Sequence, residues 1–310
     1  MSVSDVSLLH AVVTLATGGS PVRYTQLESA DLEFNDQLIS HIASGDTHPR
    51  FVAKNGSEPG IPIGTAQVAA FLAQCGNMGA NVSPVDVYYR KVSNLSGRVA
   101  HDTTEHIRFR ATLARMYLDS ISAGNRQEAV ASGRIVPVAD GTNAVLIRSG
   151  SVAITTILPT TAEGFVLGPI SYGTSSAAKL QGCDGLDISL NASQMEFGDE
   201  SEEAITFAAG DTIAPTVSFT TTDTSVDVLR GTPVENFRVH LLRKKDQNDT
   251  YGDGESQHIR CTITRGVWLV QRIAGRPAAR QVTVVASGND ANGFSDSPIA
   301  WAVNTAVALE

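Results

Sequence analysis

Two short stretches of this 310-residue chain decide the fold prediction: EHIRFRAT at residues 105–112 and QHIRCTIT at residues 257–264, 152 positions further along. In both, apolar and polar residues alternate, which is typical of a β-strand with one buried and one solvated face. The expected buried positions are Ile107, Phe109, Ala111 and Leu113 in the first stretch and Ile259, Cys261 and Ile263 in the second. The sequence therefore predicts a mainly β protein.

The similarity extends outward from these stretches with the same offset. Met116 and Leu118 correspond to Trp268 and Val270, and VDVYYRKV upstream of the first stretch corresponds to FRVHLLRKK upstream of the second. Because the matching pieces keep their order, we interpret the chain as a tandem duplication, with one β domain at 1–155 and a second at 156–310. The alternative is that two unrelated β domains share strand composition by chance.

Each copy is expected to hold one helix. Val68, Phe71, Leu72 and Cys75 form a helical stripe that Thr65 can cap and Gly76 can end. In the second copy, Asp223 can cap a shorter helix over residues 224–230. The predicted architecture is two tandem copies of an antiparallel β-sandwich or open barrel, each flanked by one α-helix.

The negative charge of the chain lies mostly in the second copy. Residues 1–155 have 12 basic and 13 acidic side chains, whereas residues 156–310 have 11 and 19. Aligning Leu32 with Leu186 and Gly45 with Gly210 gives the second copy about 11 extra residues, which we interpret as an acidic loop insertion near 191–209. Its acidic residues are Glu196, Asp199, Glu200, Glu202 and Glu203. This loop is either an ordinary solvated loop or a docking surface that also repels phosphate.

Motifs for chemistry are missing from the sequence. It has no phosphate-binding glycine loop, dinucleotide fingerprint, zinc-protease helix or nucleophile elbow. His106 and His258 occupy equivalent positions but lack partners at ligand spacing, so we expect them on the solvated face of their strands. Residues 246–257 resemble a calcium loop, yet Tyr251 and Gln257 stand where glycine and glutamate are required, which favours a polar hairpin tip. We expect no metal, no cofactor and no enzyme activity.

Partners and compartment follow from charge and hydropathy. A net charge of −9 argues against tight, sequence-independent binding of nucleic acid. No apolar run reaches the ~20 residues of a membrane helix, and no basic segment precedes the first apolar stretch. We therefore expect that the protein does not associate with a membrane and that it folds in the cytoplasm.

Taken together, these features resemble the tail tube proteins of long-tailed bacteriophages. The resemblance is carried by VDVYYRKV and FRVHLLRKK, by the strands that follow each, by the helices at 65–75 and 224–230, and by the early strands around Leu32 and Leu186. It implies a sandwich that closes into a central barrel, and trimeric rings of pseudo-sixfold symmetry stacked into a channel for DNA delivery. The protein would be assembled in the host cytoplasm into the virion tail. Its partners would be copies of itself, the tape measure and the baseplate or tip proteins, with DNA passing without tight binding.

The same resemblance suggests where rings would dock. The acidic loop at 191–209 is the candidate ring-to-ring contact, and two basic clusters, Arg90-Lys91 and Arg243-Lys244-Lys245, are its possible charge partners. An acidic lumen would let DNA slide past. The near-neutral first copy departs from a uniformly acidic channel.

Two other functions remain open at this stage. The first is another virion structural protein, such as a capsid decoration or head–tail joining subunit, which shares folds with tube proteins. The second is a carbohydrate-binding or adhesive double sandwich. Sugar-binding modules usually present exposed aromatic residues on loops, whereas Trp268 and Trp301 lie within apolar strands of this sequence.

Overall fold

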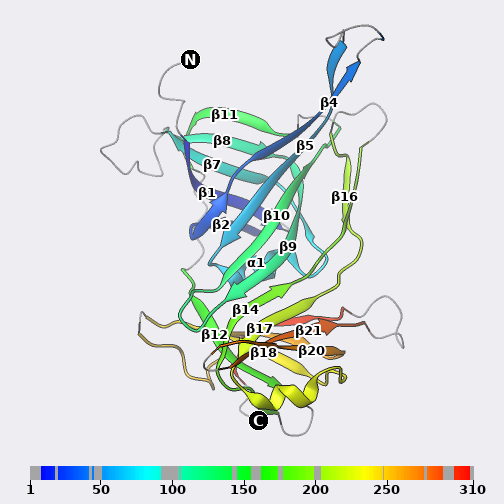
Figure 1. Ribbon diagram of the computed structural model, residues 1–310. Coiled ribbons are helices and arrows are strands. Elements are labelled where there is room, and N and C mark those ends of the chain that lie inside the picture. The colour runs from blue at the N-terminus through cyan, green and yellow to red at the C-terminus, as the bar shows by residue number, and fades with distance from the viewer. Residues whose placement is uncertain are drawn as a thin grey trace.

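The fold is known from a computed structural model of the chain (Figure 1). The structure describes residues 8–17, 20–41, 44, 51–91, 104, 106–141, 145–154, 162–173, 177–198, 204–246, 248–275, 278–288 and 297–307. Two five-stranded sheets, one ten-stranded sheet and a two-stranded hairpin make up this part of the chain. The mainly β prediction is confirmed.

Among the described residues, the first half of the chain contains eleven strands and one helix. In chain order they are β1 (Leu8–Thr17), β2 (Ser20–Tyr24), β3 (Leu27–Ala30), β4 (Glu33–His41), β5 (Phe51–Thr65), α1 (Val68–Cys75), β6 (Ala80–Val82), β7 (Val85–Lys91), β8 (His106–Ala111), β9 (Leu113–Ala123), β10 (Val130–Val138) and β11 (Ile147–Val152).

The second half contains another eleven strands and a short 3-10 helix. They are β12 (Phe165–Tyr172), β13 (Ala178–Lys179), β14 (Cys183–Ser189), β15 (Gln194–Phe197), β16 (Phe207–Gly210), β17 (Thr216–Thr221), η2 (Thr224–Leu229), β18 (Phe237–Arg243), β19 (His258–Ile263), β20 (Gly266–Ile273), β21 (Ala279–Ala286) and β22 (Ala300–Thr305).

The strand order of the first half recurs in the second. One five-stranded sheet has the order β11-β8-β7-β1-β2, and the other, read in the same direction, has the order β22-β19-β18-β12-β13. The ten-stranded sheet has the order β20-β21-β17-β14-β9-β10-β5-β3, in which β20-β21-β17-β14 repeats β9-β10-β5-β3. The run of four strands from the second half is thus joined head to tail with the run from the first half, and β14 lies next to β9 at the junction.

A small hydrogen-bond motif also recurs. The Thr65 hydroxyl donates to Gln26 O over 2.8 Å and accepts from Gln67 N over 3.1 Å. The Thr221 hydroxyl donates to Gln181 O over 2.6 Å and accepts from Asp223 N over 3.1 Å. This motif ties the end of β5 to the start of β3, and the end of β17 to the start of β14. It fixes which residues of the two halves are equivalent.

By this alignment the acidic segment is not an insertion, which corrects the sequence interpretation. Thr65 follows Gln26 by 39 positions, and Thr221 follows Gln181 by 40. Both intervals hold a hairpin: β4 paired with β5 in the first half, and β15 paired with β16 in the second. Gly45 lies beyond the end of β4, whereas Gly210 ends β16 near the base of its hairpin. The two glycines are therefore not equivalent. We call residues 33–60 the first hairpin and residues 194–210 the second hairpin.

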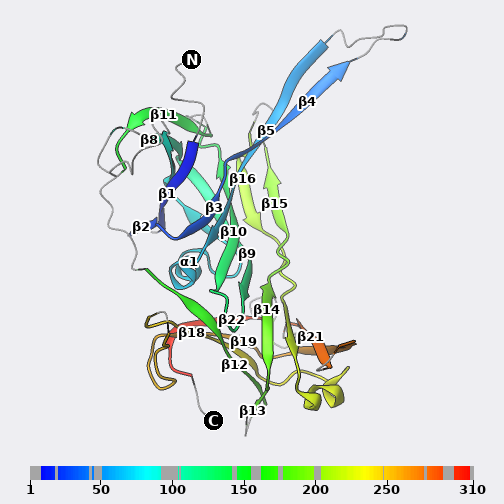
Figure 2. The ribbon, with the colours of Figure 1, turned by 60° about the vertical axis from the view of Figure 1, so that its left-hand side comes forward.

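The structure has helical elements within both segments predicted as helices, and it differs from the prediction in detail. The α1 stripe of Val68, Phe71, Leu72 and Cys75 is buried, but the N-cap residue is Gln67 and not Thr65. Asp223 does cap the second helix, since its carboxylate accepts from Ser225 N over 2.9 Å. That second element is a 3-10 helix and not an α-helix. Figure 2 shows α1 beside β9 and β10, and its Phe71 ring lies 6.3 Å from the Tyr24 ring of β2.

The core is continuous between the two halves and includes both predicted strands. Ile107 and Ala111 are buried in β8, and Ile259, Cys261 and Ile263 in β19. Leu113 is exposed instead, because β8 ends at Ala111 and Leu113 begins β9.

The histidines at the starts of β8 and β19 do not lie on a solvated face. His106 and His258 are both buried, which corrects the sequence prediction. His258 Nδ1 accepts from Arg243 N over 3.1 Å, and its Nε2 lies 2.9 Å from Gly252 O. These contacts satisfy the ring nitrogens without solvent.

Candidate assembly interface

The two halves meet where β14 pairs with β9, and we call this pairing the seam. It is antiparallel, with Leu186 opposite Ala123 and Ile188 opposite Ile121. Beyond the end of β14, Leu190 N still donates to Asp119 O over 2.9 Å. Ile121 is fully buried and Ile188 is 1% exposed. The seam is therefore both a hydrogen-bonded ladder and part of the core.

Side chains and loops reinforce the seam. Asn125, in the turn between β9 and β10, hydrogen-bonds to two residues of the second half. Its N donates to Asp184 Oδ1 over 2.9 Å, and its Nδ2 donates to Cys183 O over 2.6 Å. Glu163 Oε2 accepts from Ala69 N over 2.9 Å, so a residue just before β12 caps the first turn of α1. The halves share one sheet and one core. The boundary near residue 155 lies outside the described residues and stays a prediction.

The second hairpin extends the seam onto the open face of the ten-stranded sheet. From there Ile205 and Ala208 pack on Tyr117 of β9 and Val136 of β10. Ala139 N also donates to Ile205 O over 2.7 Å. Tyr117 is 1% exposed and Val136 is 2% exposed, so the hairpin shields a patch of sheet that would otherwise face solvent.

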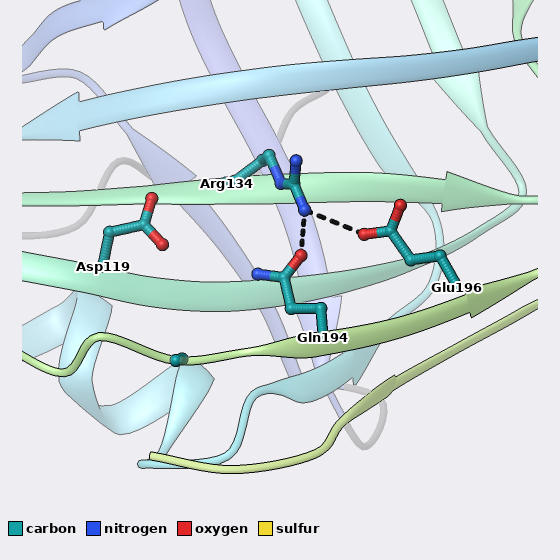
Figure 3. Close-up of a pocket in the computed structure, with 5 residues that line it drawn as sticks. Asp119, Arg134, Gln194 and Glu196 are labelled. Atoms are coloured by element: carbon teal, nitrogen blue, oxygen red, sulfur yellow. Dashed lines mark hydrogen bonds and ion pairs between the residues drawn. The ribbon is translucent and has the colours of Figure 1, made fainter. Parts of the chain in front are cut away.

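Beside this apolar contact is a polar pocket of about 520 Å³, lined by Asp119, Arg134, Ala192, Gln194 and Glu196. Figure 3 shows the Arg134 guanidinium of β10 turned toward Gln194 and Glu196 of β15. It donates to Gln194 Oε1 and to Glu196 Oε1, the latter over 2.8 Å. Burial raises the pKa of Asp119, and the charge of Arg134 opposes that rise. The polar groups of the pocket thus serve mainly to hold the second hairpin on β10.

The two ends of the ten-stranded sheet are β3 and β20, and no further strand pairs with them in the part of the chain that is described. They are the counterparts of β14 and β9, the strands that form the seam. The first residues of β20 are covered, since Trp268 N donates to Thr232 O over 3.2 Å and Val234 N donates to Gly266 O over 2.8 Å. In the same way β6 covers only the start of β9. The remaining edge of β20 carries residues 269–273.

The two open edges carry opposite charges. Glu28, Asp31 and Glu33 are exposed on and just after β3, while Arg265 and Arg272 are exposed at the start of β20 and near its end. Like edges therefore repel each other and unlike edges attract, which disfavours pairing of an edge with its own copy.

The residues predicted from sequence as docking sites are placed differently. Glu196 contacts Arg134 of its own chain and none of the predicted basic clusters. Asp199, Glu200, Glu202 and Glu203 lie outside the described residues. Arg90 and Lys91 end β7, and only their backbone is described.

The second basic cluster lies at a turn. Arg243 ends β18, Lys244 pairs with Thr250, and Lys245 is exposed with its N donating to Asp249 O over 3.0 Å. Asp246 closes the same turn, since its carboxylate accepts from Asn248 N and Asp249 N. The polar hairpin tip expected here is confirmed. The acidic and basic candidates are not brought together among the residues described.

Sequence reasoning missed the open edges themselves. A signal was present in β20, GVWLVQRI, because it is apolar at consecutive positions and does not alternate. Trp268 and Val270 face the core, whereas Val267 and Leu269 are exposed. A strand that is apolar on both faces indicates that its second face is a contact surface.

Searches for more familiar kinds of site give little. Within the described ranges, no helix is long and apolar enough to span a membrane. No group of three or more His, Cys, Asp or Glu side chains is placed to hold a metal among those residues. No protein-family model matches the chain, and neither does any curated protein sequence. The sheet edges and the surfaces beside them are therefore the features that point to a function.

Proposed function

We propose that the chain is a tandem duplication that builds a ring, in which β3 of one copy pairs with β20 of the next. Stacked rings of this kind would form the tail tube of a bacteriophage. The observation that carries the proposal is the seam: β14 and β9 pair inside the chain, and their counterparts β3 and β20 are left open at opposite ends of the same sheet.

The seam supplies a register for the pairing between chains. In the ladders, Ile188 is opposite Val217 and Glu33 is opposite Gly60, so the shared turn motif makes Leu32 the counterpart of Ile188. The pairing of β9 with β10 likewise makes Arg272 the counterpart of Ile121, since both lie opposite the matching residues Arg280 and Ala131. Leu32 of one copy would then lie opposite Arg272 of the next, with Glu33 opposite Gln271.

A pairing between two different edges is head to tail, so it repeats until it closes on itself. Closure with three chains gives six similar units, which is the pseudo-sixfold ring that the sequence resemblance implies. The ten-stranded sheets would join into one barrel around a channel. The acid excess of the second half suits passage of DNA, because a polyanion is not held by an acidic wall.

Mass measurement and negative-stain electron microscopy of the purified protein test this proposal. The expected results are a soluble species of three times 32.7 kDa, ring-shaped particles, and long hollow tubes at higher concentration. A chain that stays monomeric at micromolar concentration contradicts ring formation. Rings that never stack would retain the edge pairing and point to a head–tail joining subunit instead of a tube.

A further inference from the structure

We propose that an apolar patch on β20 and β21, formed by Val267, Leu269 and Val285, is the seat for the first hairpin of a second copy of this chain. This inference rests on the edge pairing of the proposed function and assigns it a second contact surface. The three side chains are 43%, 49% and 36% exposed. Side chains this apolar on one open sheet face indicate a surface that is covered in the assembled state.

The same positions in the first half are already covered. Arg115 is opposite Val136 and Tyr117 is opposite Arg134 in the ladder of β9 and β10. Val267 is opposite Val285 and Leu269 is opposite Thr283 in the ladder of β20 and β21. Leu269 and Val285 are therefore the counterparts of Tyr117 and Val136, which the second hairpin buries to 1% and 2% exposure.

The occupant follows from the order of elements along the chain. The second hairpin comes directly after β14, the strand that pairs with β9, so it is carried onto β9 and β10 by the seam. The first hairpin comes directly after β3, the strand proposed to pair with β20 of the next copy. Figures 1 and 2 show β4 and β5 running outward beyond the rest of the molecule. Pairing of β3 with β20 therefore brings the first hairpin over β20 and β21 of the neighbour.

The chemistry of the two seats differs in a way that suits this occupant. The seat in the first half includes Arg134, which pairs with Glu196 of the second hairpin. The corresponding residue in the second half is Thr283, so no charge stands at that position to pair with a carboxylate. The sequence of the first hairpin is apolar at several places, among them Phe34, Leu38, Ile39, Phe51 and Val52. Apolar residues such as these match an apolar seat that has threonine in place of the arginine.

Site-specific photocrosslinking tests the seat directly. A benzophenone amino acid replaces Leu269 in the full-length protein, and labelled and unlabelled chains are mixed so that mass spectrometry separates contacts between chains from contacts within one. Crosslinks from residue 269 should fall in residues 33–60 of another copy. The same probe at Val228, which is 78% exposed on η2, is the matched control and should give no crosslink to residues 33–60. Crosslinks from residue 269 to the second hairpin, to any other segment, or to its own chain would overturn the inference.

A substitution gives a second readout. Leu269→Arg should weaken assembly at least tenfold by sedimentation while the thermal midpoint of the monomer stays unchanged, because Leu269 is half exposed. Val228→Arg should leave assembly as in the wild type. A wild type that forms rings together with an L269R variant that assembles equally well would refute the seat and leave the proposed function standing. A wild type that never assembles would refute the proposed function itself, and the seat with it.

Discussion

Strands β9 and β20 have the same place in their halves of the molecule, but only β9 is paired with other strands along both of its edges. The outer edge of β9 is paired with β14, and Ile121 on that edge is fully buried. The outer edge of the corresponding stretch of β20 has no strand partner among the described residues, and Gln271, Arg272 and Ile273 are all exposed. The comparison teaches that this strand type needs a partner on both sides. In the proposed ring, the chain provides that partner once and a second copy provides it at β20.

Blocking the β20 edge should give the largest effect. The backbone groups of Trp268 point away from β21, since its N donates to Thr232 O and its O accepts from Gly231 N. The backbone N–H and C=O of Arg272, four residues further along the strand, also point away from β21. Arg272→Pro therefore removes an outward N–H without breaking the ladder with β21. Each pairing of β3 with β20 between chains loses a hydrogen bond worth about 1 kcal/mol and gains a steric clash. The protein concentration needed for assembly should therefore rise by more than about tenfold in analytical ultracentrifugation.

Arg272→Ala is the matched control for that variant. It removes the ion pair with Asp227, in which Arg272 is 77% exposed, but it keeps the backbone donor. Assembly should weaken far less than in Arg272→Pro, because an exposed charge contributes little to either the ion pair with Asp227 or the attraction of an acidic edge. Equal loss of assembly in both variants would show that the side chain matters and the edge does not.

Shortening one side chain at the seam and its counterpart at the open edge should have different effects on the stability of the monomer. Ile188→Ala empties a fully packed site and should lower the free energy of unfolding by about 3 kcal/mol. Leu32→Ala, at the counterpart position, should cost only about 1 kcal/mol in the monomer, because Leu32 is partly exposed there. Urea denaturation of the monomer measures both changes. Similar costs for the two variants would mean that the edge at β3 is already buried in the free chain.

The effect of pH falls on stability alone and again contrasts the halves. Burial is the main cause that lowers the pKa of His240 to about 4; the nearby charges of Arg260 and Arg238 act in the same direction, and a contact with Pro169 O opposes them. The unfolded chain then takes up a proton that the folded chain refuses, so stability is complete above about pH 6.5 and falls as the pH drops toward 4. Between pH 7 and pH 5 the loss should be about 2 kcal/mol in the free energy of unfolding.

His240→Gln should flatten this slope, as measured by urea denaturation at a series of pH values. The counterpart of His240 in the first half is Tyr88, which has no basic nitrogen to protonate; the ladders place Tyr88 opposite Arg108 and His240 opposite Arg260. A slope that is unchanged in the variant would assign the acid sensitivity to other groups.

Local pattern predicted the elements of this fold better than it predicted their surroundings. The alternation in β8 and β19 and the stripe of α1 were sufficient, because periodicity depends only on neighbouring residues. His106 and His258 were assigned to the wrong face, because their burial comes from neighbouring strands and loops that are distant in sequence. Gly45 and Gly210 were aligned by identity, although Gly45 follows β4 in the sequence and Gly210 is the last residue of β16.

The candidate interface was harder to predict for the same reason. Glu196 was singled out by charge, but its partner Arg134 is 62 residues away and is brought close only by the seam. The open edges became visible only when the strand order was known. The exposed Val267 and Leu269 had a sequence signal, yet an apolar run alone does not say which face the core will cover.

The seam also changes how an assembly of this kind begins. Two units that share a chain meet at an effective concentration set by the connecting segment and not by the amount of protein in the cell, so their contact forms as the chain folds. A ring of six units made from three chains then has three junctions between chains, which form by two encounters by diffusion and one closure of the ring. The other junctions form in each folded chain, in the same orientation every time.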